Sequence, residues 1–90
     1  MKELHAIVFG KVQGVWFRAW TIDLAREQSV AGWVRNTPEG NVEIVGQADT
    51  EHLNNFLERL HHGPPLARVT RIESSWKKAT TQFSHFELRR

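Results

Sequence analysis

Residues 30–47, VAGWVRNTPEGNVEIVGQ, have the pattern of a β-hairpin. Residues 30–35 and 41–47 are rich in β-branched and aromatic side chains, as strands are. In the second run, Val42 and Ile44 alternate with Glu43 and Val45, so each pair occupies one face. The turn is residues 36–40, where proline fixes one backbone angle and glycine permits a left-handed one. This stretch predicts two neighbouring antiparallel strands.

A helical pattern flanks the hairpin on each side. Before it, apolar residues recur at spacings of three and four and predict a helix from about Phe17 to Gln28. After it, Asp49 or Thr50 can cap a second helix, which Gly63-Pro64-Pro65 ends. The apolar stripes consist of Phe17, Trp20, Leu24 and Ala25 in the first helix and Leu53, Phe56, Leu57 and Leu60 in the second.

Three further segments have strand character. Leu4 to Phe9 precedes the first helix and is stopped by Gly10, while Ala67 to Trp76 and the short Phe83 to Arg89 follow the second. The order β-α-β-β-α-β predicts an α+β fold, the ferredoxin-like split β-α-β sandwich, over one domain of residues 1–90. We expect a mostly antiparallel sheet of four strands plus a short fifth, with two helices on one face.

Composition narrows the classes of function. The 90 residues include no cysteine, which excludes disulfide scaffolds, thiolate nucleophiles and cysteine-based zinc sites. The net charge of +2 suits a small anionic ligand and is weak evidence for nucleic-acid binding. No signal-peptide pattern or membrane-length apolar run is present, so we expect a soluble cytoplasmic protein without a membrane partner.

The segment between the first strand and the first helix is residues 10–18, GKVQGVWFR. Glycines allow a tight backbone turn, and a helix N-terminus presents unpaired N–H groups, so such a loop can hold an anion. The segment lacks the Gly-Lys-Ser/Thr ending of a nucleotide-binding P-loop and the glycine spacing of a dinucleotide site. A plain connecting loop remains the alternative at this point.

Arg18 lies in the first turn of the predicted helix, among Trp16, Phe17 and Trp20. It can stack on an indole ring, which is one interpretation. A cation in the first turn opposes the helix dipole unless an anion is nearby, which favours an anion site. Its planar guanidinium can bind two phosphate oxygens at once.

Asn36 ends the second strand. Its amide can donate and accept hydrogen bonds at once, so it can orient a water molecule. The alternative is that Asn36 only caps the turn before Pro38, which asparagine often does.

Together these segments resemble the acylphosphatase family. Residues 10–18 are similar to its first signature, G-x-V-Q-G-V-x-F-R, and residues 32–36 with 40–43, GWVRN and GNVE, to its second, G-W-V-x-N…G-x-V-E. The resemblance covers essentially the whole chain, with no departure at Arg18 or Asn36. Trp16 fills a variable position of the first signature.

The resemblance implies a hydrolase that splits the carboxyl–phosphate bond of acyl phosphates without a metal or cofactor. It implies catalytic roles for Arg18, which binds the phosphate, and Asn36, which orients the attacking water. It also implies a phosphate-binding segment consisting of Lys11, Val12, Gln13, Gly14, Val15, Trp16, Phe17 and Arg18. The expected ligands are a small acyl phosphate and inorganic phosphate, and the expected state is a monomer.

Other interpretations stay open. The five histidines lack the spacing of a zinc-binding HExxH motif, so no metal site is expected. The chain has four tryptophans, of which Trp16, Trp20 and Trp33 are expected to line the core or flank the loop rather than stack on RNA bases. The main alternative is a domain on the same fold that binds an anion without turnover. The family that the chain resembles also includes acylphosphatase-like domains within larger carbamoyl-transfer and hydrogenase-maturation proteins.

Overall fold

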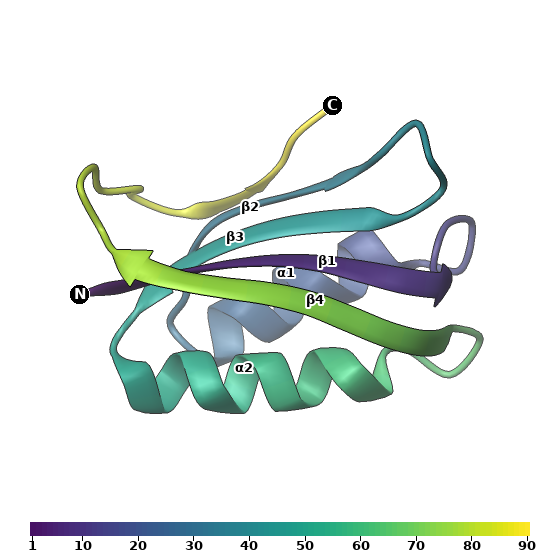
Figure 1. Cartoon of the computed structure of the whole chain (residues 1–90), viewed down its shortest axis with the longest axis horizontal. Helices are drawn as coiled ribbons and strands as arrows, with labels where there is room; N and C mark the ends of the chain where they lie inside the picture. The colour runs from purple at the N-terminus through teal and green to yellow at the C-terminus, as the bar shows by residue number, and fades with distance from the viewer.

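The computed structural model describes residues 1–90 as one five-stranded sheet with two helices (Figure 1). The strands are β1 (Lys2–Lys11), β2 (Ala31–Asn36), β3 (Val42–Ala48), β4 (Arg68–Lys78) and β5 (Phe86–Leu88). The helices are α1 (Phe17–Glu27) and α2 (Thr50–His62). The strand order is β4-β1-β3-β2-β5, and every pair is antiparallel except β2 with β5. The predicted ferredoxin-like fold with its mostly antiparallel sheet is confirmed.

Both helices pack on the same face of the sheet, and one hydrophobic core lies between the layers. Leu4, Ala6 and Val8 of β1 alternate toward this core and are fully buried. The predicted helix stripes point into the same cluster, with Trp20 and Leu57 only partly buried at its rim. The core therefore fixes α1, and with it the loop that precedes α1, against the sheet.

The hairpin forms as the alternation predicts. β2 and β3 pair with Val34 opposite Ile44 and Asn36 opposite Val42. Gly32 is required where the strands meet, because its φ is 147° and an added Cβ would lie 1.9 Å from the carbonyl oxygen of Val45. The register brings Asn36 to the end of β2, next to the turn.

The first strand is longer than predicted. Gly10 does not end β1, which continues to Lys11 through a bulge between Phe9 and Gly10. Gly10 has φ 127°, and a Cβ there would lie 2.0 Å from the carbonyl oxygen of Arg68 on β4. Glycine is therefore required at this position because β4 approaches it closely. The sequence of β1 alone gives no sign of that approach.

The second helix begins with a side-chain cap. Asp49 is the cap, and its Oδ1 accepts a hydrogen bond of 2.9 Å from the backbone N–H of His52. This resolves the choice between Asp49 and Thr50. Neither α1 nor α2 is both long and apolar enough to cross a membrane.

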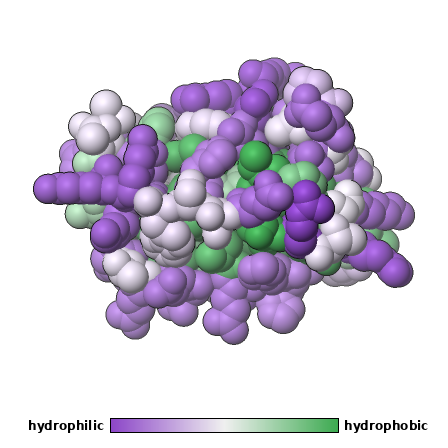
Figure 2. Space-filling view, in the orientation of Figure 1, coloured by the Kyte–Doolittle hydropathy of each residue, from purple (hydrophilic) through white to green (hydrophobic).

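The sheet face opposite the helices is exposed and largely hydrophilic around a hydrophobic centre (Figure 2). β4 forms one edge of the sheet, and most of its side chains are exposed. Arg71 of β4 lies over the ring of Phe9, with its guanidinium carbon 3.9 Å from the ring centroid. The charged side chains of β4 are Arg68, Arg71, Glu73, Lys77 and Lys78.

One ion-pair network joins three strands on this open face. Glu43 Oε2 lies 2.6 Å from His5 Nε2, and Glu43 Oε1 accepts a 2.6 Å hydrogen bond from Arg35 Nε. Partial burial by itself raises the pKa of Glu43. The hydrogen bonds from His5 and Arg35, with their charges, outweigh burial and lower this pKa below its ordinary value of 4.5.

We expect Glu43→Gln to reduce the dependence of stability on acid pH. Because the pKa of Glu43 is lowered in the folded state, its carboxylate stabilises the protein above pH 4.5, and this contribution is lost as the pH falls through the lowered pKa. The variant should have a lower Tm at neutral pH and a smaller loss of Tm on acidification. Calorimetry from pH 7 to pH 3 measures this, with Glu73→Gln as the exposed control. Equal Tm losses in wild type and Glu43→Gln would contradict it.

Candidate active site

The loop from Val12 to Trp16 joins β1 to α1 and is shaped by two left-handed residues. Gly14 has φ 72°, and Trp16, the N-cap of α1, has φ 67°. Trp16 makes no side-chain cap, and its indole is 77% exposed. The side chains of Val12, Val15 and Phe17 are at most 4% exposed, so they anchor the loop in the core. The loop therefore has a fixed shape and a helix end without a cap.

A continuous run of backbone donors is free along this loop. The N–H groups of residues 12–19 donate no hydrogen bond within the chain, and Trp20 is the first residue whose N–H finds a carbonyl, that of Trp16. The first turn of α1 contains no acidic residue that would neutralise its positive end. Unpaired N–H groups at a helix N-terminus attract an anion.

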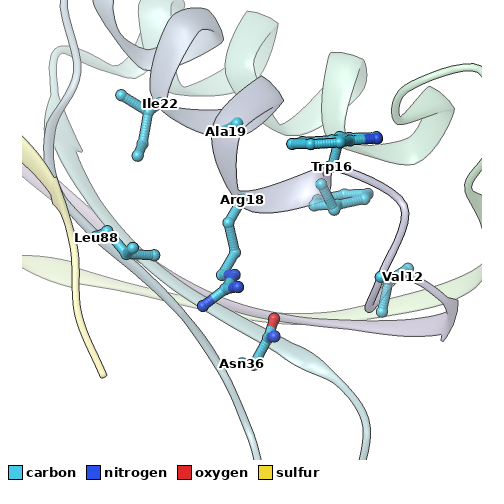
Figure 3. A pocket seen from close by; sticks show the side chains of 9 residues that line it. Val12, Trp16, Arg18, Ala19, Ile22, Asn36 and Leu88 are labelled. Atoms are coloured by element: carbon cyan, nitrogen blue, oxygen red, sulfur yellow. The ribbon is translucent and has the colours of Figure 1, made fainter.

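Arg18 is not engaged by another side chain. It forms no ion pair and no hydrogen bond, and the cation–π contacts of the chain are Arg71 over Phe9 and Arg89 over Trp33. The predicted alternative, stacking of Arg18 on an indole, does not occur. Its guanidinium instead points into a cavity toward Asn36 (Figure 3). A permanently charged, unpaired group in a cavity is available to bind an anion.

Asn36 faces Arg18 from the end of β2. Its Oδ1 atom is buried and has no hydrogen-bond partner. An unsatisfied buried polar atom costs about 1–3 kcal/mol of folding free energy, so a ligand or water is expected to compensate it. The alternative role, capping the turn, is not taken up: Thr37 and Asn41 close the turn through their own hydrogen bonds.

Gln13 connects the loop to the turn after Asn36. Its Nε2 donates to the carbonyl oxygens of Thr37 at 2.9 Å and Asn41 at 2.8 Å. The two segments that carry Arg18 and Asn36 are thereby held together at their outer ends. The sequence placed Gln13 in the phosphate-binding segment, and the structure adds this side-chain contact, which spans 24 and 28 residues.

A cavity of about 410 Å³ lies between α1, the loop, β2 and β5. Among the residues predicted from sequence, it brings together Val12, Gly14, Trp16, Phe17, Arg18 and Asn36. Lys11, Gln13 and Val15 do not line it: Lys11 is exposed at the end of β1, and Val15 is 4% exposed. The lining residues that sequence reasoning missed are Ala19, Ile22 and Leu88.

None of the five histidines lines this cavity. His52 contacts Asp49, and His85 lies between Ser84 and Glu87. No three His, Asp or Glu side chains come together in an arrangement that could hold a metal ion. Trp20 packs edge-on against Phe17 at the rim of the core, 5.4 Å between centroids.

Comparison with known proteins gives one consistent family. A family model described as Acylphosphatase matches residues 4–88. An acylphosphatase of Methylococcus capsulatus is 43% identical over 90 residues, which cover 100% of this chain and 98% of that relative. An acylphosphatase of Thermococcus kodakarensis is 48% identical over 75 residues, covering 82% and 81% of the two chains.

The fold has a close counterpart among solved structures. The crystal structure of an acylphosphatase from Bacillus subtilis superposes with a TM-score of 0.98 at 32% identity, covering 100% of both chains. The sheet, both helices and the loop before α1 therefore follow a path that an experimental structure also shows.

Proposed function

Because the chain belongs to the acylphosphatase family, a family of hydrolases, we propose that Arg18 and the loop amides bind the phosphoryl group of an acyl phosphate and that Asn36 orients the water that attacks it. The reaction splits the carboxyl–phosphate bond and yields a carboxylate and inorganic phosphate. One observation carries the assignment of residues: the unpaired guanidinium of Arg18 faces the unsatisfied Oδ1 of Asn36 in a cavity beside free backbone N–H groups.

The binding step follows from charge and geometry. The N–H groups of residues 12–19 have no partner within the chain, and the last of them form the N-terminus of α1, where the dipole favours negative charge. Arg18 adds a fork that can bind two phosphoryl oxygens. These donors are held in place before substrate arrives, so they stabilise charge that develops in the transition state without reorganising.

The attack step uses Asn36. Its amide can accept a hydrogen bond from a water molecule and hold the lone pair of that water toward phosphorus. A carboxylate is a good leaving group, so protonation by a general acid is not required. Since Arg18 and the amides supply the positive charge, the proposed mechanism also requires no divalent metal ion.

The test is hydrolysis of benzoyl phosphate by the purified chain in EDTA, beside Arg18→Gln and Asn36→Ala. Rapid turnover by wild type, lost in both folded variants, supports the metal-independent reaction and both residue roles. Absence of wild-type turnover with phosphate still bound would instead indicate an anion-binding domain.

Inorganic phosphate should raise the Tm of the wild-type protein. A ligand that binds only the folded state stabilises it by mass action, by about 2.7 kcal/mol at a hundred times its Kd. Arg18→Gln should show a much smaller shift, because it lacks the charge that binds phosphate. Scanning fluorimetry in sulfate-free phosphate measures the Tm shifts of both proteins, with chloride at equal ionic strength as the reference. Equal shifts in the two proteins would contradict the assignment of Arg18.

We expect Gln13→Ala to lower kcat/KM for benzoyl phosphate by about tenfold, the equivalent of one to two net hydrogen bonds. The variant loses both bonds to Thr37 and Asn41, so the loop can move relative to the strand that carries Asn36. Steady-state kinetics and Tm measure the effect, with the exposed Gln82→Ala as control. If the kinetic parameters of Gln13→Ala equalled those of wild type, the hydrogen bonds between the loop and the turn would not be needed for activity.

We also propose that the protein acts as a monomer in the cytoplasm. Arg18, Asn36 and the free N–H groups come from one chain, so the proposed site needs no second copy. The chain has no cysteine that depends on an oxidising compartment. Light scattering measures the oligomeric state, and a stable dimer would overturn that part of the proposal.

A further inference from the structure

We propose that Ile22 and Leu88 form an apolar subsite for the acyl group, so that the enzyme favours acyl phosphates with bulky apolar acyl groups over small or polar ones. This inference rests on the proposed function, because it assumes that the phosphoryl group lies at Arg18 and the loop. It concerns the part of the same cavity that the phosphoryl group does not use.

The cavity has two chemically different sides. Ile22 and Leu88 lie on one side of Arg18, and Val12 and Trp16 lie on the other (Figure 3). Most of the free N–H groups, those of residues 12–16, belong to the loop, and its residues Val12 and Trp16 lie on that side. A phosphoryl group bound between those amides and Arg18 therefore leaves the other side open to the rest of the substrate.

The position of Ile22 is fixed by the helix. Arg18 and Ile22 are four residues apart on α1, so their side chains lie one above the other on the same face. Ile22 is only partly buried and packs against the core cluster at its base. Its remaining surface is presented to the cavity one helical turn beyond the guanidinium.

The position of Leu88 is fixed by strand register. In the parallel pair of β2 and β5, Leu88 is opposite Val34, and the N–H of Arg89 donates a 2.8 Å hydrogen bond to the carbonyl oxygen of Val34. Asn36 is two residues beyond Val34 and points to the same face of the sheet. Leu88 is thus held beside Asn36 while 39% of it stays exposed.

The lining offers little to a polar acyl group. Apart from Arg18 and Asn36, the cavity is lined by glycine, alanine, aliphatic and aromatic side chains. The proposed mechanism already uses both polar side chains for the phosphoryl group and the water. Burying the exposed surfaces of Ile22 and Leu88 against an apolar acyl group is favourable, whereas a charged or hydroxylated group would lose its hydration there without a partner.

The experiment compares two stable analogues in which a methylene group replaces the bridging oxygen: phenacylphosphonate, with a phenyl group, and 2-oxopropylphosphonate, with a methyl group. Calorimetry gives Kd for each, and parallel kinetics give kcat/KM for benzoyl and acetyl phosphate. We expect wild type to favour the phenyl compound by about tenfold in Kd, within the range that apolar pockets achieve. Ile22→Ala and Leu88→Ala should each reduce this preference by about threefold.

Leu66→Ala is the control, because Leu66 is 66% exposed and does not line the cavity. It should keep the wild-type preference. Leu88→Ala removes an exposed side chain, so it keeps the test valid if Ile22→Ala destabilises the fold.

The outcomes separate the two proposals. A phenyl preference that falls in both variants supports the subsite, whether or not the chain turns over substrate. Equal affinity of wild type for the two phosphonates, or a preference that survives both substitutions, would overturn the subsite while leaving the hydrolase assignment intact. Failure to hydrolyse any acyl phosphate, with the phenyl preference present, would overturn only the proposed chemistry.

Discussion

Arg18→Gln is expected to lower kcat/KM for benzoyl phosphate by at least ~10²–10³-fold, the usual cost of removing one preorganised donor. The loss should be at the upper end, because the substitution removes a full charge as well as a fork of donors. The fold should be unaffected, since Arg18 makes no ion pair or hydrogen bond with the rest of the chain. Steady-state kinetics and Tm without phosphate measure both effects.

Two further variants sharpen this test. Arg18→Lys keeps the charge and loses the planar fork, so it should recover part of the loss in phosphate affinity and little of the loss in kcat. Arg26→Gln changes an exposed arginine of the same helix and should behave as wild type. If Arg18→Gln retained kcat/KM within threefold of wild type, the guanidinium would have no part in the reaction.

Asn36→Ala is expected to lower kcat by about 10²–10³-fold with little change in phosphate affinity. The amide orients water in the proposed mechanism, whereas Arg18 and the loop hold the phosphoryl group. Since the substitution also removes a buried oxygen without a partner, Tm should be unchanged or higher. Kinetics, phosphate titration and calorimetry on one preparation measure all three quantities.

The pattern of parameters decides the role of Asn36. A raised KM with an unchanged kcat would assign it to ground-state binding and would refute the role in positioning water. A fall in Tm together with a fall in kcat would indicate that Asn36 supports the turn. Asn54→Ala, on an exposed position of α2, is the control for a general loss of an asparagine.

The sequence predicted the architecture because the architecture depends on local patterns. The helical spacing of Leu53, Phe56 and Leu60 predicts which face of α2 is buried, and the structure agrees. The alternation in residues 41–47 places Val42 and Ile44 correctly in the core, although Val45 and Gln47 on the other face of this central strand are buried as well. Gly10 was misjudged because its requirement comes from Arg68, a residue far away in sequence. The strand propensity of a single residue carries no information about which other strand packs against it.

In the site, too, local sequence features were predicted, whereas contacts between distant segments were not. Arg18 stands out because a cation at a helix start opposes the helix dipole. Asn36 by itself could equally cap the turn, and its role was predicted from the resemblance to the second family signature. The partners of Gln13 and the contribution of Leu88 depend on which strands pair, which the sequence pattern left open for residues 83–89. A parallel β5 beside β2 is what turns an ordinary alternating leucine into part of the cavity wall.

The two edges of the sheet differ in how they resist unwanted pairing. β5 covers β2, but β4 leaves a row of backbone groups open along eleven residues. Four of its five charged side chains are basic, Arg71 and Lys77 among them, and this positive charge disfavours a strand from a second copy, because like charges would mostly meet across the new pair. Neutralising the basic side chains of β4 is therefore expected to promote aggregation at high concentration without touching the cavity.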